Sequence, residues 1–282
     1  VLLVGNLVSQ DVVLERNLFL RNREGVKMYG AGEPGATLRG NLFQTSAGEA
    51  VKGQLGGIVR LVFDGGAPNG YASNGFDGIA IEGGTLNATG TLWNDAGAPY
   101  RIIATPEVGA GKGLIIRPGV TIQMSSGKEL DVSGNLYAQG TTDAPIVFTD
   151  TETGIRKAAG QWGTIKFIPG SVGRMERCTV EFGGGTTAGL WVERGSDVTV
   201  TDSVIRFSKG MGLYYRTNVG APPGRLLVER SRFADNVQGP GVNADWASLD
   251  LGENSGGAAV VALRDSVVER SGLSGARRTG VR

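Results

Sequence analysis

The feature that most constrains the fold of this sequence is a short pattern that recurs along the chain. It reads an apolar residue, two residues of any type, then Asn, Ser or Cys, one further residue, and a second apolar residue. The six instances are centred on Asn17, Asn41, Cys178, Ser203, Ser231 and Ser266. Neighbouring centres are 24, 25, 28 and 35 residues apart, which matches one coil of a parallel β-solenoid with loops of varying length. Helical repeats would need two amphipathic helices in each period, and glycine with β-branched residues at these positions argues against that.

A second short strand follows a glycine in several of these units. Glycine supplies 48 of the 282 residues, about 17% against an average of roughly 7%, and many glycines stand at the expected coil corners. Because side chains alternate along a strand, one set points inward and the other outward. The inward set is Val26, Leu190, Leu213 and Val242, and the outward set is Lys27, Trp191, Tyr214 and Asn243.

The same alternation places the central polar residue of each pattern on the inward face, beside a turn. Small polar side chains stacked there can hydrogen-bond the backbone of the neighbouring coil, as asparagine ladders do in stacked β structures. We therefore expect a structural ladder made of Asn17, Asn41, Cys178, Ser203, Ser231 and Ser266. The single cysteine, Cys178, is interpreted as a buried member of this ladder, and one cysteine excludes an internal disulfide framework.

Segments between Pro99 and Gly184 carry a resemblance to a known family. They are Leu114–Ile122, Leu130–Thr141, Pro145–Thr149, Trp162–Phe167 and Arg177–Gly184, in that order. This series resembles bacterial secreted and cell-surface proteins built of right-handed parallel β-helix repeats. The resemblance implies an elongated, all-β, right-handed parallel β-helix in an extracellular or cell-surface location. It does not imply an activity, because the family includes adhesins, surface modules and accessory regions of polysaccharide-active enzymes.

The order of the segments predicts a division of the chain. Residues 1–53 are expected to form coils that end one solenoid unit, residues 54–98 a glycine-rich connector or insertion, and residues 99–282 a second β-helix unit. A single continuous solenoid with an insertion is the alternative. The run Arg60–Gly66 weakly repeats the pattern of Cys178–Gly184, which keeps that alternative open.

Composition excludes several functional classes. The sequence contains no histidine, which rules out a Ser-His-Asp triad, an imidazole base and a histidine-bearing zinc site. The net charge is +1, and no basic run with interleaved aromatic residues is present, so nucleic acid is not expected as a partner. No apolar stretch of about 18 residues occurs, and no membrane span is expected in this chain.

An enzymatic function is the first alternative to a binding or structural one. A polysaccharide lyase or hydrolase with carboxylates and an Arg or Lys is chemically feasible, and calcium held by carboxylates could assist a lyase. No other cofactor is expected. The carboxylates available in turns and loops are Asp143, Asp150, Glu152, Asp202, Asp235, Asp245, Asp250 and Glu253. None of them occupies one coil position in neighbouring repeats beside an outward arginine, so the sequence favours a non-catalytic module.

The sequence feature that best suits a binding site is the outward pair Trp191 and Tyr214. If consecutive coils are in register, the two residues lie about 4.8 Å apart on one flank, with Arg216 also pointing outward. Flat aromatic faces beside polar groups suit sugar rings or a protein partner. The predicted binding residues are Trp191, Tyr214, Arg216 and Asn243. The alternative is that the loop Asn218–Gly224 folds over the aromatic pair.

Three leucines, Leu18, Leu20 and Leu42, are also predicted to point outward. Exposed leucines indicate a cover or a neighbouring molecule, so self-assembly as a subunit of a surface layer or filament is a further alternative. The function expected first is a non-catalytic structural, adhesive or glycan-binding β-helix module, whose partner is a polysaccharide or a protein at the cell surface.

Overall fold

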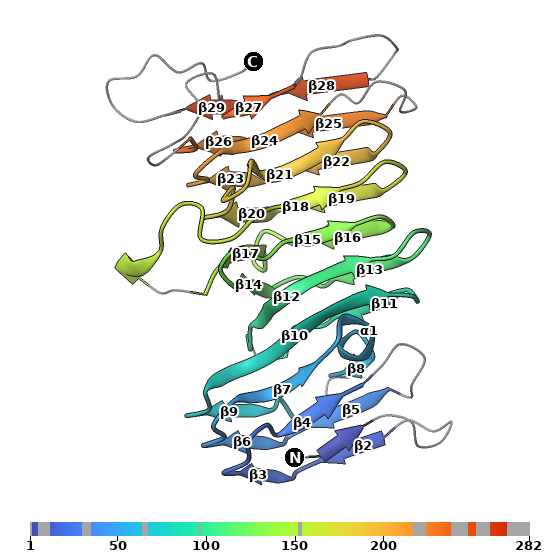
Figure 1. Cartoon of the computed structure of the whole chain (residues 1–282), viewed down its shortest axis with the longest axis vertical. Coiled ribbons are helices and arrows are strands. Elements are labelled where there is room, and N and C mark those ends of the chain that lie inside the picture. Colours follow the sequence, from blue (N-terminus) through green and yellow to red (C-terminus); the bar gives the residue numbers. More distant parts are fainter. Residues whose placement is uncertain are drawn as a thin grey trace.

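The computed structural model is an elongated stack of β-strands, with the N-terminal strands at one end and the C-terminal strands at the other (Figure 1). It describes residues 2–4, 12–29, 35–63, 67–95, 97–151, 154–216, 224–237, 248–251 and 260–269. The helical segments within these residues are α1 (Leu55–Ile58) and the 3₁₀ turn η1 (Gly154–Arg156). Among the described residues, no helix has the length and apolar character that crossing a bilayer requires.

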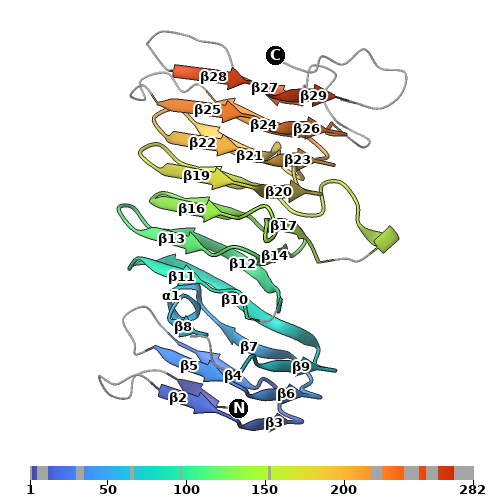
Figure 2. The ribbon, with the colours of Figure 1, turned by 180° about the vertical axis from the view of Figure 1, so that it is seen from behind.

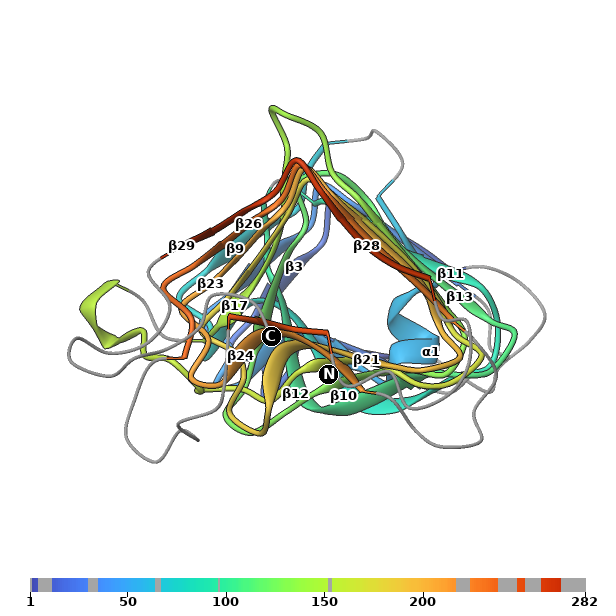
Figure 3. The same ribbon diagram turned by 90° about the horizontal axis from the view of Figure 1, so that it is seen from above.

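Each coil contributes strands to a first, a second and a third face, and these faces form a triangular cross-section (Figure 3). Seen from the C-terminal end, the chain runs from the first face through an apex to the second face and then along the third. This path is anticlockwise as the stack rises toward the viewer, so the helix is right-handed. All strand pairs are parallel; neighbouring coils pair in register, for example Leu190 with Leu213. The expected right-handed parallel β-helix is confirmed.

The first face is seen most fully from behind (Figure 2). It consists of a three-stranded ladder followed by a seven-stranded ladder. The strands are β2 (Val12–Glu15), β5 (Ala36–Arg39) and β8 (Leu61–Val62), then β11 (Gly90–Leu92), β13 (Gly113–Ile116), β16 (Asn135–Gln139), β19 (Val172–Glu176), β22 (Asp197–Thr201), β25 (Arg225–Glu229) and β28 (Val260–Arg264).

The second face begins with a three-stranded ladder and resumes higher in the stack as one arm of the largest sheet. Its strands are β3 (Leu18–Leu20), β6 (Leu42–Gln44) and β9 (Gly70–Ala72), then β14 (Thr121–Met124), β17 (Ile146–Asp150), β20 (Cys178–Glu181), β23 (Val204–Arg206), β26 (Arg232–Ala234) and β29 (Val267–Glu269).

The third face runs through the whole stack. Its strands are β1 (Leu2–Val4), β4 (Val26–Met28), β7 (Glu49–Gly53), β10 (Phe76–Leu86), β12 (Tyr100–Val108), β15 (Leu130–Val132), β18 (Ile165–Phe167), β21 (Ala188–Glu193), β24 (Met211–Arg216) and β27 (Leu249–Asp250).

The largest sheet forks at β12. The first part of this strand, Tyr100–Ile102, pairs with β14, whereas Glu107 and Val108 pair with β15. Below the fork, β12 pairs with β10, and β10 pairs with β7. The stretch 54–98, which contains α1 and all of β8–β11, is therefore hydrogen-bonded to coils on both sides of it. Above the fork, the two arms carry the second and third faces.

The interior of the stack is filled by the inward-pointing residues of all three faces. Rows of aliphatic and aromatic side chains lie one above another, for example Phe19, Phe43 and Tyr71, whose ring centroids are 4.7 and 5.5 Å apart. The largest fully buried side chains are Trp162, Tyr100, Tyr215 and several phenylalanines. This continuous packing, with the backbone ladders along the axis, is what stabilises a solenoid.

The longest departure from the coil path among the described residues connects β17 to β18 and folds back on the second face. Trp162 in this excursion is buried, and its Nε1 donates to the Glu181 carbonyl at 3.0 Å. Lys157 Nζ donates to Glu181 Oε1 at 3.0 Å and to Thr149 Oγ1 at 2.7 Å. On its other side, Glu181 accepts two hydrogen bonds from Arg206, at 2.7 and 2.9 Å. The excursion thus contacts the second face at both the backbone carbonyl and the carboxylate of Glu181.

Candidate functional site

One outward row on the third face combines acidic, basic and aromatic side chains. Its members occupy the same position in successive coils, and each is paired in register with the next. We call it the outward row, and it consists of Glu107, Asp131, Lys166, Trp191, Tyr214 and Asp250. The parallel ladder spaces these residues by about 4.8 Å, so the row forms a straight strip along the axis of the stack.

The aromatic part of the outward row is the pair predicted from the sequence. The rings of Trp191 and Tyr214 lie 5.8 Å apart at 61°, an edge-to-face arrangement, and both side chains are partly exposed. Period-2 alternation in β21 and β24 turns these two side chains outward while Leu190 and Leu213 are buried. A partly exposed indole with a phenol at its edge provides a flat apolar surface with a polar rim.

Charged side chains surround Trp191. Lys166 Nζ lies 4.9 Å from the centroid of the indole ring, and the Arg216 guanidinium lies 5.7 Å from it. Both cations also contact the Glu193 carboxylate, at 3.6 and 3.9 Å. Because Glu193 bridges the two cations, it holds them beside the ring and cancels part of their charge.

Two buried polar atoms in the outward row have no hydrogen-bond partner among the residues that the structure describes. They are Trp191 Nε1, a donor, and Asp131 Oδ1, an acceptor. A buried polar atom without a partner costs free energy, and such atoms are usually satisfied by water or by a ligand. Both atoms are buried, so the row holds one unsatisfied donor and one unsatisfied acceptor below its surface.

Carboxylates dominate the lower part of the row. Glu107 accepts a hydrogen bond from Ser133 Oγ at 2.7 Å, and Glu129, beside the row, accepts one from Thr186 Oγ1 at 3.2 Å. Burial raises the pKa of Asp131, and Glu107 raises it further against the opposing effect of Lys166. Burial also raises the pKa of Glu129, with Asp131 adding to the effect. The strip is thus acidic below Lys166 and aromatic directly above it, with Asp250 beyond Tyr214.

The sequence-based prediction of binding residues covers only part of this surface. Trp191, Tyr214 and Arg216 lie together, whereas Asn243 and residues 218–223 of the candidate covering loop lie outside the described residues. The prediction missed Asp131, Lys166 and Glu107. The signal was present, since Leu130-Asp131-Val132 and Ile165-Lys166-Phe167 show the same alternation as Leu190-Trp191-Val192.

The predicted inward ladder has a defined hydrogen-bond pattern. In each step, the backbone N–H of one coil donates to a side-chain oxygen of the next coil. The acceptors are Asn41 Oδ1 for Asn17 (3.0 Å), Ser203 Oγ for Cys178 (3.0 Å), Ser231 Oγ for Ser203 (3.2 Å) and Ser266 Oγ for Ser231 (3.1 Å). Asn69 and Asp95, which the sequence pattern did not indicate, continue it above Asn41.

Cys178 is a member of this ladder. Its Sγ donates to the Ala138 carbonyl at 3.3 Å, and the side chain is buried. Burial raises the pKa of the Cys178 thiol to about 12. The thiolate, which is the reactive form, is therefore suppressed at neutral pH.

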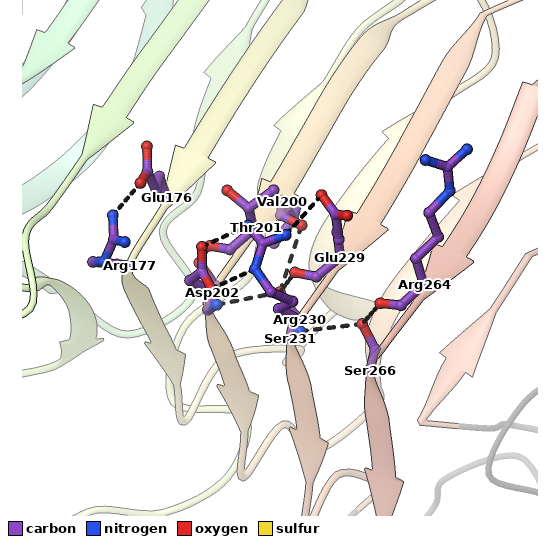
Figure 4. A network of polar contacts seen from close by, with 11 residues as sticks. Glu176, Arg177, Val200, Thr201, Asp202, Glu229, Arg230, Ser231, Arg264 and Ser266 are labelled. Carbon is purple, nitrogen blue, oxygen red and sulfur yellow. Dashed lines mark hydrogen bonds and ion pairs between the residues drawn. The ribbon is translucent and has the colours of Figure 1, made fainter.

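A second candidate surface lies on the outer side of the stack, at the corner between the first and second faces and beside Cys178. A groove of about 290 Å³ there is lined by threonines together with Arg177 and Asp202. Its charges are satisfied internally, because Arg177 pairs with Glu176 and Asp202 pairs with Arg230 (Figure 4). This leaves the groove less to offer a ligand than the outward row.

Within the described parts of the chain, no three His, Cys, Asp or Glu side chains converge as a metal site would require. Comparison with protein-family models finds no match, and no curated protein or solved structure is found to be similar to the chain. The function therefore has to be argued from the geometry of the outward row.

Proposed function

We propose that this chain is a non-catalytic, extracellular glycan-binding module of a bacterial surface, and that the outward row is its binding surface. The observation that carries the proposal is the partly exposed Trp191–Tyr214 pair, with the Lys166 and Arg216 cations beside the indole ring. Sugar rings pack their C–H faces on aromatic rings, while their hydroxyl groups bond donors and acceptors at the rim.

The charges along the row favour a neutral, hydroxyl-rich glycan. Lys166 and Arg216 are already paired with Glu193, so they are poor sites for an additional carboxylate. At the lower end, Glu107 and Asp131 repel an anionic chain but accept hydrogen bonds from hydroxyl groups. We therefore expect a neutral polysaccharide to lie along the axis of the stack.

The direct test is a glycan array followed by titration calorimetry with the glycans that bind. Trp191→Ala and Tyr214→Ala are each expected to weaken binding about tenfold, because each removes roughly 1.5 kcal/mol of apolar contact. Tyr137→Ala is the matched control, since Tyr137 also points outward from a strand but lies on the first face. Equal losses in all three variants, or no binding to any glycan, would contradict the proposal.

A hydrolase is the second candidate, and one observation favours it. Glu107 and Asp131 are neighbours in register, and the raised pKa of Asp131 is the property that a general acid needs. A hydrolase would release reducing ends from a bound polysaccharide, and Asp131→Asn would abolish that release. Binding of a polysaccharide without release of reducing ends excludes the hydrolase and supports the non-catalytic glycan-binding module.

A further inference from the structure

Glu193 lies among the charged groups beside the aromatic pair of the outward row. It follows Trp191 by two residues in β21, so alternation turns both side chains outward. The Glu193 side chain is only 11% exposed, against 29% for Lys166 and 46% for Arg216. The carboxylate therefore lies deeper than the two cations, which reach further toward the surface.

The register of three strands brings both cations to this carboxylate. Lys166 of β18 pairs with Trp191 in the coil above it, and Glu193 pairs with Arg216 of β24, one coil higher again. Lys166 and Arg216 thus approach Glu193 from the two neighbouring coils. Both contact the same atom, Oε1, at 3.6 and 3.9 Å. One carboxylate oxygen is therefore shared by two cations.

These ion pairs leave the donor groups of both cations available. Their distances of 3.6 and 3.9 Å are longer than the range of about 2.7–3.2 Å that is typical of a hydrogen bond. Among the described residues, neither Lys166 Nζ nor the Arg216 guanidinium has a hydrogen-bond acceptor. An ammonium and a guanidinium each carry several donor hydrogens, and the oxygen atoms of a sugar can accept them.

The charges in this part of the row balance each other. Lys166 and Arg216 supply two positive charges, and the carboxylates of Glu193 and Asp131 supply two negative ones. Asp131 is the neighbour of Lys166 in the row, but within the described residues Lys166 forms its ion pair with Glu193 instead. Glu193 is thus the carboxylate that reduces the positive charge beside the indole ring.

We propose that Glu193 determines the charge selectivity of the row, because it lets the two cations donate to hydroxyl oxygens but prevents them from binding a carboxylate or sulfate group. An anionic group placed to accept from both cations would also approach the Glu193 carboxylate, and the repulsion between the two anions offsets the attraction. A hydroxyl group carries no net charge and meets no such repulsion. The inference rests on the proposed binding of a glycan to the outward row, and it names the residue that decides which glycans bind.

The test removes the charge of Glu193 and keeps its shape. Glu193→Gln leaves Lys166 and Arg216 without a carboxylate between them, so anionic glycans should bind better than they bind the wild type. The full 282-residue chain is probed on an array that holds neutral, uronate-containing and sulfated glycans. Titration calorimetry then uses one matched pair of ligands, oligogalacturonate and the same oligosaccharide with its carboxyl groups reduced to hydroxymethyl groups.

The affinity for oligogalacturonate is expected to rise about tenfold in Glu193→Gln relative to the wild type. Salt should reverse this gain, because the new attraction is electrostatic and lies at the surface. Adding Arg216→Gln to Glu193→Gln should also remove the gain, since the charges then balance again. A folded Glu193→Gln variant that binds oligogalacturonate no better than the wild type, and gains no anionic glycan on the array, would overturn the proposal.

Two control variants separate the charge of Glu193 from other effects. Glu193→Asp keeps the negative charge and should exclude anionic glycans as the wild type does. Glu229→Gln changes the net charge by the same amount at the corner between the first and second faces, where Glu229 contacts Arg230 at 3.1 Å. It should bind anionic glycans no better than the wild type. An equal gain in Glu229→Gln would show that net charge, and not Glu193, sets the selectivity.

The outcomes separate this inference from the proposed function. Circular dichroism and thermal unfolding first establish that each variant is folded, and Glu193→Thr, with a side chain suited to strands, replaces Glu193→Gln if that variant does not fold. Neutral glycans bound by the wild type, with no anionic glycan gained by the variant, would contradict the role of Glu193 and leave glycan binding intact. Anionic glycans gained by the variant and lost with Arg216→Gln, with no neutral glycan bound by the wild type, would support the role of Glu193 and contradict the proposed function.

Discussion

At the scale of single residues, the stack depends on small polar side chains that bond across coils. Asn41 shows this most clearly. Its Oδ1 accepts from both the backbone and the side chain of Asn17, and its Nδ2 donates to the Leu14 carbonyl and to Asn69 Oδ1. Because Asn41 is buried, these bonds replace water that the turn would otherwise need. Asn17, at the end of the ladder, is exposed.

This difference gives a prediction for stability. Asn41→Ala should lower the free energy of unfolding by about 2–4 kcal/mol, because it removes four hydrogen bonds at a buried position. Asn17→Ala should cost under about 1 kcal/mol, since water can replace its bonds. Urea unfolding of both variants measures the two values. Similar losses of unfolding free energy in the two variants would mean that burial does not determine how much a ladder residue stabilises the stack.

The sequence predicted this ladder only where its flanking pattern is intact. Asn17 and Asn41 follow their strands after one corner residue, and the pattern found them. Asn69 is separated from β8 by a longer connection, Phe63–Pro68, which breaks the spacing that the pattern needs. Asp95 follows β11 after two residues and carries a carboxylate instead of an amide. Asn69 and Asp95 thus accept the same kind of hydrogen bond as Asn41, although each lies at a different distance from the strand before it.

At the scale of elements, the fork at β12 organises the molecule. Strands β10 and β12 each extend across two faces, and a bulge shifts their register between Ile81 and Glu82, where Ile103 of β12 is the extra residue. Gly83 and Gly84 follow the bulge with φ of 81° and 85°, a backbone conformation that L residues with a side chain rarely adopt. Alternation within short windows predicted individual strands well. It could not predict the fork, which depends on pairing between strands distant in sequence.

The excursion that carries Lys157 and Trp162 gives a prediction at this scale. Burial alone would raise the pKa of Glu181, but hydrogen bonds from Arg206 and Lys157 outweigh burial and hold that pKa below its usual range. The stabilisation is therefore complete above the ordinary glutamate pKa, about 4.3, and is lost as the pH falls through the lowered value in the folded state.

Glu181→Gln is expected to lower the free energy of unfolding by about 1–2 kcal/mol near neutral pH, because both cations lose their partner while they remain partly exposed. The difference from the wild type should shrink in acid, once Glu181 itself is protonated. Urea unfolding at a series of pH values measures this. Glu15→Gln, at an exposed position, should change stability by under about 0.5 kcal/mol. A difference at Glu181 that is independent of pH would contradict the assignment.

At the scale of the whole molecule, the parallel stack converts a one-dimensional repeat into straight rows of side chains. The resemblance and the repeat were enough to predict the fold, because coil spacing and inward patterning are local properties. They predicted the aromatic pair of the candidate site for the same reason. Sequence alternation turns Asp131 and Lys166 outward but does not show that they share a register with Trp191; the strand pairing does, so the acidic part of the row is not predicted.

The central claim is that a glycan lies along this row, and a series of oligosaccharides of increasing length tests it most directly. From Glu107 to Tyr214 the row spans four strand spacings, roughly 19 Å. Calorimetric affinity for the best neutral glycan should rise with each added sugar until the ligand spans that length and then level off, and Trp191→Ala should lower the whole series. Affinity that is independent of length, or that is unchanged in Trp191→Ala, would contradict the account.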